Sequence, residues 1–137
     1  MTMTASKLMY EGIQRVLLGR FPELGGRVEK AFGSYYDLQA ETPEAYPLFE
    51  DALQGFVLQL LETGQNDQLL RRIFAFFEEM ADSSDRNVVD LLSIAILEAL
   101  VFRRESVLRA WGYMGEKTKE LASETARSLG RQENLPP

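Results

Sequence analysis

Apolar residues recur at helical spacing along most of the chain, and no stretch shows the strict alternation typical of a half-buried strand. The first two apolar stretches predict helices over residues 6–20 and 22–36, the second of them weakened by three glycines. Pro22 is compatible with the start of the second helix, because the first helical position needs no amide hydrogen. The chain is therefore expected to begin as two short helices.

Two prolines shape the next segment, after an expected loop over residues 37–42. Thr42-Pro43-Glu44 has the composition of a helix start, with a capping hydroxyl, a proline and an acid near the positive end of the helix dipole. Pro47 lacks the amide hydrogen that a continuing helix would use. We therefore expect a short turn at residues 43–46 and a helix over residues 47–63.

The middle of the chain predicts a helical hairpin. Residues 70–81 keep three-and-four apolar spacing, and Asn66 or Asp67 can cap that helix. Residues 83–85 read Ser-Ser-Asp and predict a turn. Residues 87–101 are apolar around most of a helix, which places this helix in the middle of the fold.

The region 69–100 resembles one helical hairpin of a HEAT-type repeat, but no second copy with matching spacing follows. Two weaker helices are expected over residues 104–111 and 116–129, and the tail 131–137 is expected to be frayed. The predicted fold class is all-α: one domain over residues 1–137, forming a compact bundle of about six helices around a HEAT-like central hairpin.

The chain of 137 residues contains neither cysteine nor histidine. The first absence excludes disulfides and thiol nucleophiles, and the second excludes the commonest general base and the commonest transition-metal ligand. No phosphate-binding glycine loop or nucleophile elbow occurs in the sequence. We therefore expect no enzyme activity, no cofactor and no metal site.

The net charge of −6 and the pI of about 4.8 lack the basic footprint of a nucleic-acid-binding protein. The longest apolar stretch, residues 88–102, is interrupted by polar residues and is too short to span a bilayer. The N-terminal residues do not have the pattern of a signal peptide. These features favour a cytoplasmic protein without nucleic-acid or membrane partners.

Glu78, Glu79 and Asp82 form the densest carboxylate group. Glu78 and Asp82 lie one helical turn apart, as in the first half of the motif of all-helical, magnesium-dependent nucleotide pyrophosphatases. The second half needs an acid followed three residues later by another acid, and neither Asp90 nor Glu98 has one. A solvated helix end is the better interpretation, and a magnesium-dependent nucleotide hydrolase is the weakest alternative.

Two further groups have a structural and a functional interpretation. Glu98 is either a buried acid inside a very apolar helix or a member of its polar arc, and we favour the second. Trp111, with Tyr113 and Met114, is either a binding anchor or core packing near a helix end, and we favour packing.

The charge distribution is more informative than any motif. Residues 31–70 contain seven acids and no lysine or arginine, so that this segment alone has a net charge of −7. Tyrosine among acids favours a protein-binding surface, because the ring buries area at a small entropy cost while carboxylates steer a cationic partner. A merely solvated acidic face is the other interpretation of this segment. The predicted partner-binding residues are Tyr35, Tyr36, Asp37, Glu41, Glu44, Tyr46, Glu50 and Asp51.

Three stretches resemble a small family of bacterial all-helical domains, over about residues 10 to 130. They are Tyr46-Pro47-Leu48-Phe49, the segment from Leu70 to Ala81 continuing to Leu97-Glu98-Ala99-Leu100, and the segment from Tyr113 to Leu121. The third is similar to a Gly-Pro-Lys-Thr pattern of the family, with Glu116 where proline is usual. Gly115-x-Lys117-Thr118 is its most specific piece.

Members of that family resemble immunity proteins, which are encoded beside secreted polymorphic toxins and neutralise them by binding. The resemblance implies a cognate toxin as the partner, and many such toxins have basic clefts because they attack nucleic acid or nucleotides. It implies no catalytic residue. We therefore expect a monomer or weak homodimer that blocks a toxin through the region 35–51. The alternative from another class is a helical adaptor or homodimer that associates through Phe76 or Trp111.

Overall fold

The computed structural model describes residues 7–33 and 43–137, and none of these residues lies in a β-strand. In chain order the elements are α1 (Ile13–Arg20), η1 (Pro22–Leu24), α2 (Gly25–Phe32), α3 (Ala45–Leu48), η3 (Phe49–Leu53), α4 (Gln54–Thr63), α5 (Asp67–Ala81), α6 (Arg86–Leu92), η4 (Ser93–Leu97), α7 (Glu98–Phe102), α8 (Arg104–Trp111), α9 (Glu116–Ser128) and η5 (Gln132–Asn134). The prediction of an all-α bundle is confirmed.

Two helices contain a π-helical segment. The helix α3–η3–α4 runs without a break from Ala45 to Thr63, and α6–η4–α7 runs from Arg86 to Phe102. In each, five residues near the middle take the wider π-helical turn: η3 in the first and η4 in the second. π-Helical turns are rare inside α-helices and are frequent at functional sites.

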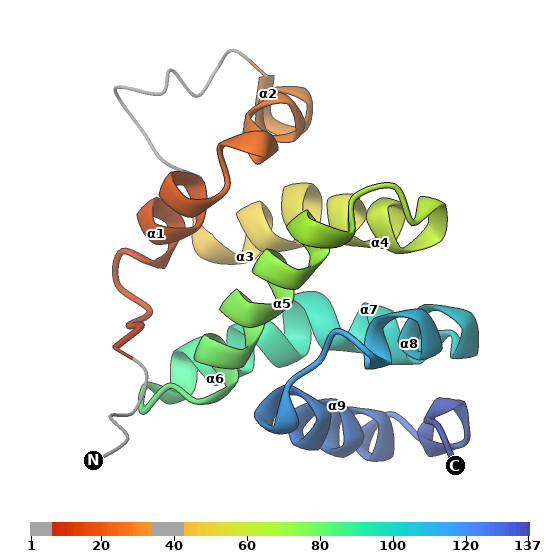
Figure 1. The fold of residues 1–137 in the computed structure, drawn as a ribbon. Coiled ribbons are helices and arrows are strands. Elements are labelled where there is room, and N and C mark those ends of the chain that lie inside the picture. The colour runs from red at the N-terminus through yellow and green to blue at the C-terminus, as the bar shows by residue number, and fades with distance from the viewer. Residues whose placement is uncertain (1–6, 34–42) are drawn as a thin grey trace.

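Helices α2, α3–η3–α4, α6–η4–α7 and α9 are stacked in the order of the chain (Figure 1). Helix α2 packs on η3, η3 packs on η4, and α7 packs on α9. Helix α5 crosses this stack and contacts α4, α6 and α9. Helices α5 and α6 form the predicted central hairpin, joined by the short turn at residues 82–85.

Helix α5 supplies much of the core, because its apolar stripe faces the other helices. The predicted stripe is buried as expected, and Phe76 on its flank is buried too, at 1% exposure. The largest fully buried side chains are Phe49, Phe74, Phe76, Phe77, Ile13, Leu17, Leu24, Leu48, Leu53, Leu70, Ile73 and Met80. They form one cluster, so that all the described helices share a single core.

Side-chain caps begin both helices of the hairpin. The Asn66 side chain accepts a hydrogen bond from the amide of Leu69 (3.2 Å), and Asp85 accepts one from the amide of Asn87 (3.0 Å). The second carboxylate oxygen of Asp85 also accepts from the amide of Tyr10 (2.8 Å). One predicted cap therefore also ties the segment before α1 to the hairpin.

Two helix starts differ from the prediction. Helix α1 begins at Ile13 rather than near residue 6, because Gly12 takes a left-handed conformation (φ 84°) that interrupts a helix. Helix α3 begins at Ala45 rather than at Pro47. Pro47 is the third helical residue. Amides in the first turn have no carbonyl partner within the helix, so a proline at this position does not prevent the helix from starting before it.

The C-terminal tail was expected to be frayed, but its residues in η5 are packed against the rest of the fold. Helix α7 ends at Phe102 and leaves backbone carbonyls without a helical partner. The Asn134 side-chain amide donates to the carbonyls of Val101 (2.9 Å) and Phe102 (3.1 Å), and Arg104 donates to the carbonyl of Glu133 (2.8 Å). Polar partners at a helix end thus hold a tail whose composition predicts fraying.

Candidate functional site

Half of the predicted partner-binding residues lie outside the described residues, namely Tyr35, Tyr36, Asp37 and Glu41. The other half lies on the first turns of the helix α3–η3–α4. Glu44, Glu50 and Asp51 are exposed, as a partner-binding surface requires. Tyr46 is half-buried beside Tyr10, with the two ring centroids 6.4 Å apart. Burial raises the pKa of the Tyr46 hydroxyl. The ring packs against the core, so only part of this tyrosine is open to a partner.

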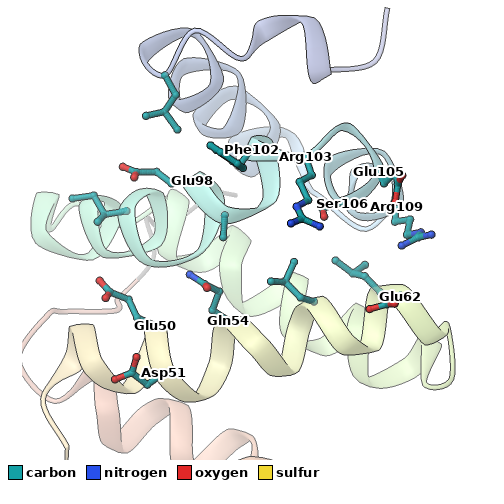
Figure 2. Close-up of a pocket in the computed structure, with 15 residues that line it drawn as sticks. Glu50, Asp51, Gln54, Glu62, Glu98, Phe102, Arg103, Glu105, Ser106 and Arg109 are labelled. Atoms are coloured by element: carbon teal, nitrogen blue, oxygen red, sulfur yellow. The ribbon is translucent and has the colours of Figure 1, made fainter. Parts of the chain in front are cut away.

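Glu50 and Asp51 lead into an open groove of about 1080 Å³ between α4 and α7–α8 (Figure 2). It is lined by Glu50, Asp51, Gln54, Leu58, Leu61, Glu62, Ile94, Glu98, Ala99, Phe102, Arg103, Glu105, Ser106, Arg109 and Leu129. Figure 2 shows Glu50 and Gln54 pointing from one wall toward the helix that bears Glu98 and Phe102.

Each long wall of the groove is one face of a helix. Glu50, Gln54 and Leu58 recur at four-residue spacing on η3–α4, which brings them to the same side of that helix. Ile94 and Phe102 flank Glu98 at the same spacing on η4–α7. The start of α8 closes one end. The groove therefore results from two parallel stripes of side chains that the core holds at a fixed separation.

Exposed apolar side chains gather in this groove. Among the described residues, five large hydrophobic side chains are exposed, and three of them line the groove: Ile94 (47%), Phe102 (55%) and Leu129 (41%). The helix bearing Ile94 is central to the fold, as predicted, but this residue was expected to be part of its buried surface. An apolar contact area inside a polar rim is typical of a binding site rather than of a solvated surface.

The groove is also acidic. Five carboxylates and two arginines line it, which leaves a net charge of −3. Elsewhere in the described parts of the chain, carboxylates pair with arginines, as in Arg20–Glu79, Arg71–Asp67, Arg72–Glu23 and Arg86–Asp90. Within residues 7–33 and 43–137, no such pair joins Arg103 or Arg109 to a groove carboxylate. The negative charge of the groove is therefore available to a cation from outside.

The two π-helical segments meet at the base of the groove. Segments η3 and η4 contact one another, and the Gln54 side-chain amide donates a hydrogen bond of 2.7 Å to the carbonyl of Ala95 in η4. The bond joins the first residue of α4 to a backbone carbonyl of the second π-helical segment. This hydrogen bond holds the two helices together beside Glu50 and Ile94, which line the groove.

Glu78, one of the two candidate carboxylates, holds the start of α9. The Glu78 carboxylate accepts hydrogen bonds from the amides of Lys117 (3.0 Å) and Thr118 (2.9 Å) and from the Thr118 hydroxyl (2.7 Å). Burial raises the pKa of Glu78, but these donors and the Lys117 charge outweigh it and hold that pKa below its ordinary value. No group of three acids among the described residues could hold a metal ion.

The proposed alternative interfaces at Phe76 and Trp111 are not exposed. Phe76 is 1% exposed, packs edge-on against Phe21 and lies under the Arg20 guanidinium, so it offers no apolar surface to a second copy. This prediction is wrong because the helix turns Phe76 toward α1. Trp111 is half-buried against the core, with the Lys119 ammonium over its ring.

The groove was not predicted, apart from its first two residues. The sequence indicates the groove only through a polar stripe that interrupts the surface of an otherwise hydrophobic helix. This stripe consists of Glu50, Gln54 and Glu62. The partner stripe on η4–α7 cannot be separated from core residues by periodicity, because that helix is apolar on almost every side.

Residues 15–129 match a family described as a domain of unknown function (DUF7674). The match spans most of the chain, and the chain therefore belongs to this family. Comparison with curated proteins and with solved structures gives no match. All the residues that line the groove fall inside the matched range. None of the helices among the described residues has the length and apolar character needed to cross a bilayer.

Proposed function

We propose that this chain is an immunity-type protein, without enzyme activity, that binds a cognate cationic toxin and occludes its active site. The observation that supports the proposal best is the groove, where five carboxylates that form no ion pair within the described parts of the chain surround exposed apolar side chains. An inhibitor needs a rigid scaffold and a complementary surface, and the shared core supplies the first. The proposal assigns the protein to the cytoplasm.

Electrostatics supports this function physically. A toxin that acts on nucleic acid or nucleotides has a basic cleft, and an acidic surface steers such a partner into contact at a high rate. Glu44, Glu50 and Asp51 extend the acidic surface from the groove to the start of α3. These three predicted residues and the groove therefore form one candidate interface.

Co-expression tests the proposal directly. The domain to test is the C-terminal domain of a large secreted protein encoded in a neighbouring reading frame. We expect this domain to arrest growth when expressed alone and to be tolerated when this chain is co-expressed. Growth arrest that persists with equal amounts of this chain would contradict an immunity role.

Association kinetics test the electrostatic part. We expect the association rate of chain and toxin domain to fall steeply between low and physiological salt. The charge variant Glu44→Lys/Glu50→Lys/Asp51→Lys is expected to slow association strongly. A control that reverses Glu11 and Glu29, both exposed on the α1–α2 side, is expected to have a much smaller effect. A salt-independent rate would refute the steering.

A further inference from the structure

We infer that the groove between α4 and α7–α8 seats an amphipathic, cationic helix of the partner, which inserts apolar side chains on either side of a lysine or arginine. The identity of this partner as a toxin rests on the proposed function. The chemistry of the ligand rests on the groove alone.

The wall formed by η4–α7 sets the pattern that a ligand must match. Ile94 and Phe102 are eight residues apart, so along the helix axis they are separated by about 12 Å. Glu98 lies midway between them. A docked helix with apolar residues two turns apart and a cation one turn from each would contact all three side chains in register.

On the wall formed by η3–α4 the order of acidic and apolar side chains is reversed, with the acids at the ends. Glu50 lies at one end and Glu62 at the other, with Leu58 and Leu61 between them. A helix lying along the groove would bury its apolar stripe between these leucines and Phe102, and would bring a flanking lysine or arginine to Glu50 and Asp51 at one acidic end. Leu129, from the end of α9, adds apolar surface beside Phe102.

Other occupants fit the groove less well. A small molecule binds in an enclosed pocket that covers most of its surface, whereas this groove is open and, at about 1080 Å³, lies at the upper limit of such pockets. A second copy of the chain would bring two sets of unpaired carboxylates together, which disfavours association. Charge complementarity therefore favours a basic segment of another protein.

A designed peptide tests the inference without knowledge of the toxin. The probe is a leucine–lysine peptide of about 18 residues, with all leucines on one face of a helix, since shorter helices are marginal in water. One control peptide replaces leucine with serine and keeps the charge. The other replaces lysine with glutamate and keeps the apolar face. We expect binding of the probe alone.

Isoleucine methyl groups report where the peptide binds. The sequence contains four isoleucines, of which Ile94 is 47% exposed in the groove, while Ile13, Ile73 and Ile96 are at most 1% exposed. We expect the peptide to shift the Ile94 methyl resonance by far the most. Binding of the peptide with no change at Ile94 would overturn the inference.

Matched variants test the apolar and the charged contacts separately. Ile94→Ser is expected to weaken peptide binding at least about tenfold, whereas Met9→Ser, at a residue 54% exposed outside the groove, is expected to leave it unchanged. Glu50→Gln/Glu98→Gln is expected to weaken binding and to flatten its salt dependence, compared with Glu11→Gln/Glu29→Gln. Equal effects of the groove and control variants would overturn the inference.

The two proposals fail in different ways. If the groove variants protect cells from the toxin domain as well as the wild-type chain does, and Ile94 is unaffected by the peptide, the groove is not the docking site, while the immunity role stands. If no neighbouring toxin domain is neutralised but the peptide binds at Ile94, the proposed function fails and the groove inference stands.

A stable dimer whose formation shifts the Ile94 methyl resonance would show that a second copy is the occupant and would overturn the inference.

Discussion

Replacing Gly115 by alanine probes how the start of α9 is held. Gly115 precedes α9 with φ −78° and ψ 177°, a conformation open to any residue, so the glycine is not needed for its backbone. An added Cβ would overlap Cδ of Glu78 and would lie 2.5 and 2.8 Å from the two carboxylate oxygens. Alanine is therefore expected to displace the Glu78 carboxylate.

The expected cost follows from the three hydrogen bonds that this carboxylate accepts. Loss of the cap on the α9 amides costs about 0.5–2 kcal/mol. The Thr118 side chain is fully buried, and leaving its hydroxyl without a partner adds about 1–3 kcal/mol. We expect Gly115→Ala to lower the free energy of unfolding by about 1.5–5 kcal/mol, a large part of the stability of a domain of this size.

Urea denaturation of a double-mutant cycle measures this coupling. Glu78→Ala is expected to destabilise by a similar amount, because it removes the same bonds. In the Glu78→Ala background the added methyl meets no carboxylate, so Gly115→Ala is expected to cost less than about 1 kcal/mol, the residual preference for glycine over alanine at an N-cap. Additive single effects would refute the proposed contact.

Three further predictions follow from single contacts. Gln54→Leu is expected to destabilise the chain by about 1–3 kcal/mol in urea denaturation, because the Ala95 carbonyl loses its side-chain donor. The difference in unfolding free energy between wild type and Glu78→Gln is expected to be full at neutral pH and to shrink as pH falls below about 4.5. The reason is that a carboxyl group with a lowered pKa in the folded state stabilises the fold above its unfolded-state pKa, and this contribution is lost as pH falls through the folded-state pKa. A difference independent of pH would contradict the lowered pKa. Asn134→Ala is expected to speed hydrogen exchange of the amides of residues 132–135 without slowing refolding, because two carbonyl contacts of the tail are lost.

Local patterns predicted the parts of the fold that depend on near neighbours. Asn66 and Asp85 cap the hairpin helices as expected, since a capping side chain bonds to an amide two or three residues ahead. The stripe of α5 is buried as its spacing predicts. The position of Pro47 was misjudged by a local rule as well, because the proline was treated as an interior helical residue rather than a first-turn one.

Contacts between distant segments could not be predicted in the same way. The Gly115-x-Lys117-Thr118 stretch was the most specific piece of the family resemblance, and its residues face a carboxylate 39 and 40 positions earlier. The π-helical segments depend on how two helices pack, and the groove depends on both. Glu44, Glu50 and Asp51 are exposed, and their role in binding a partner stays a prediction, while residues 34 to 42 lie outside the described residues.

The most direct test of the central claim is methyl cross-saturation in a complex of this chain with the toxin domain. Irradiation of the toxin is expected to reduce the signal of Ile94, while Ile13, Ile73 and Ile96 keep theirs because they lie in the core. A stable complex in which Ile94 keeps its full intensity would contradict the claim that the acidic groove is the surface that receives the toxin.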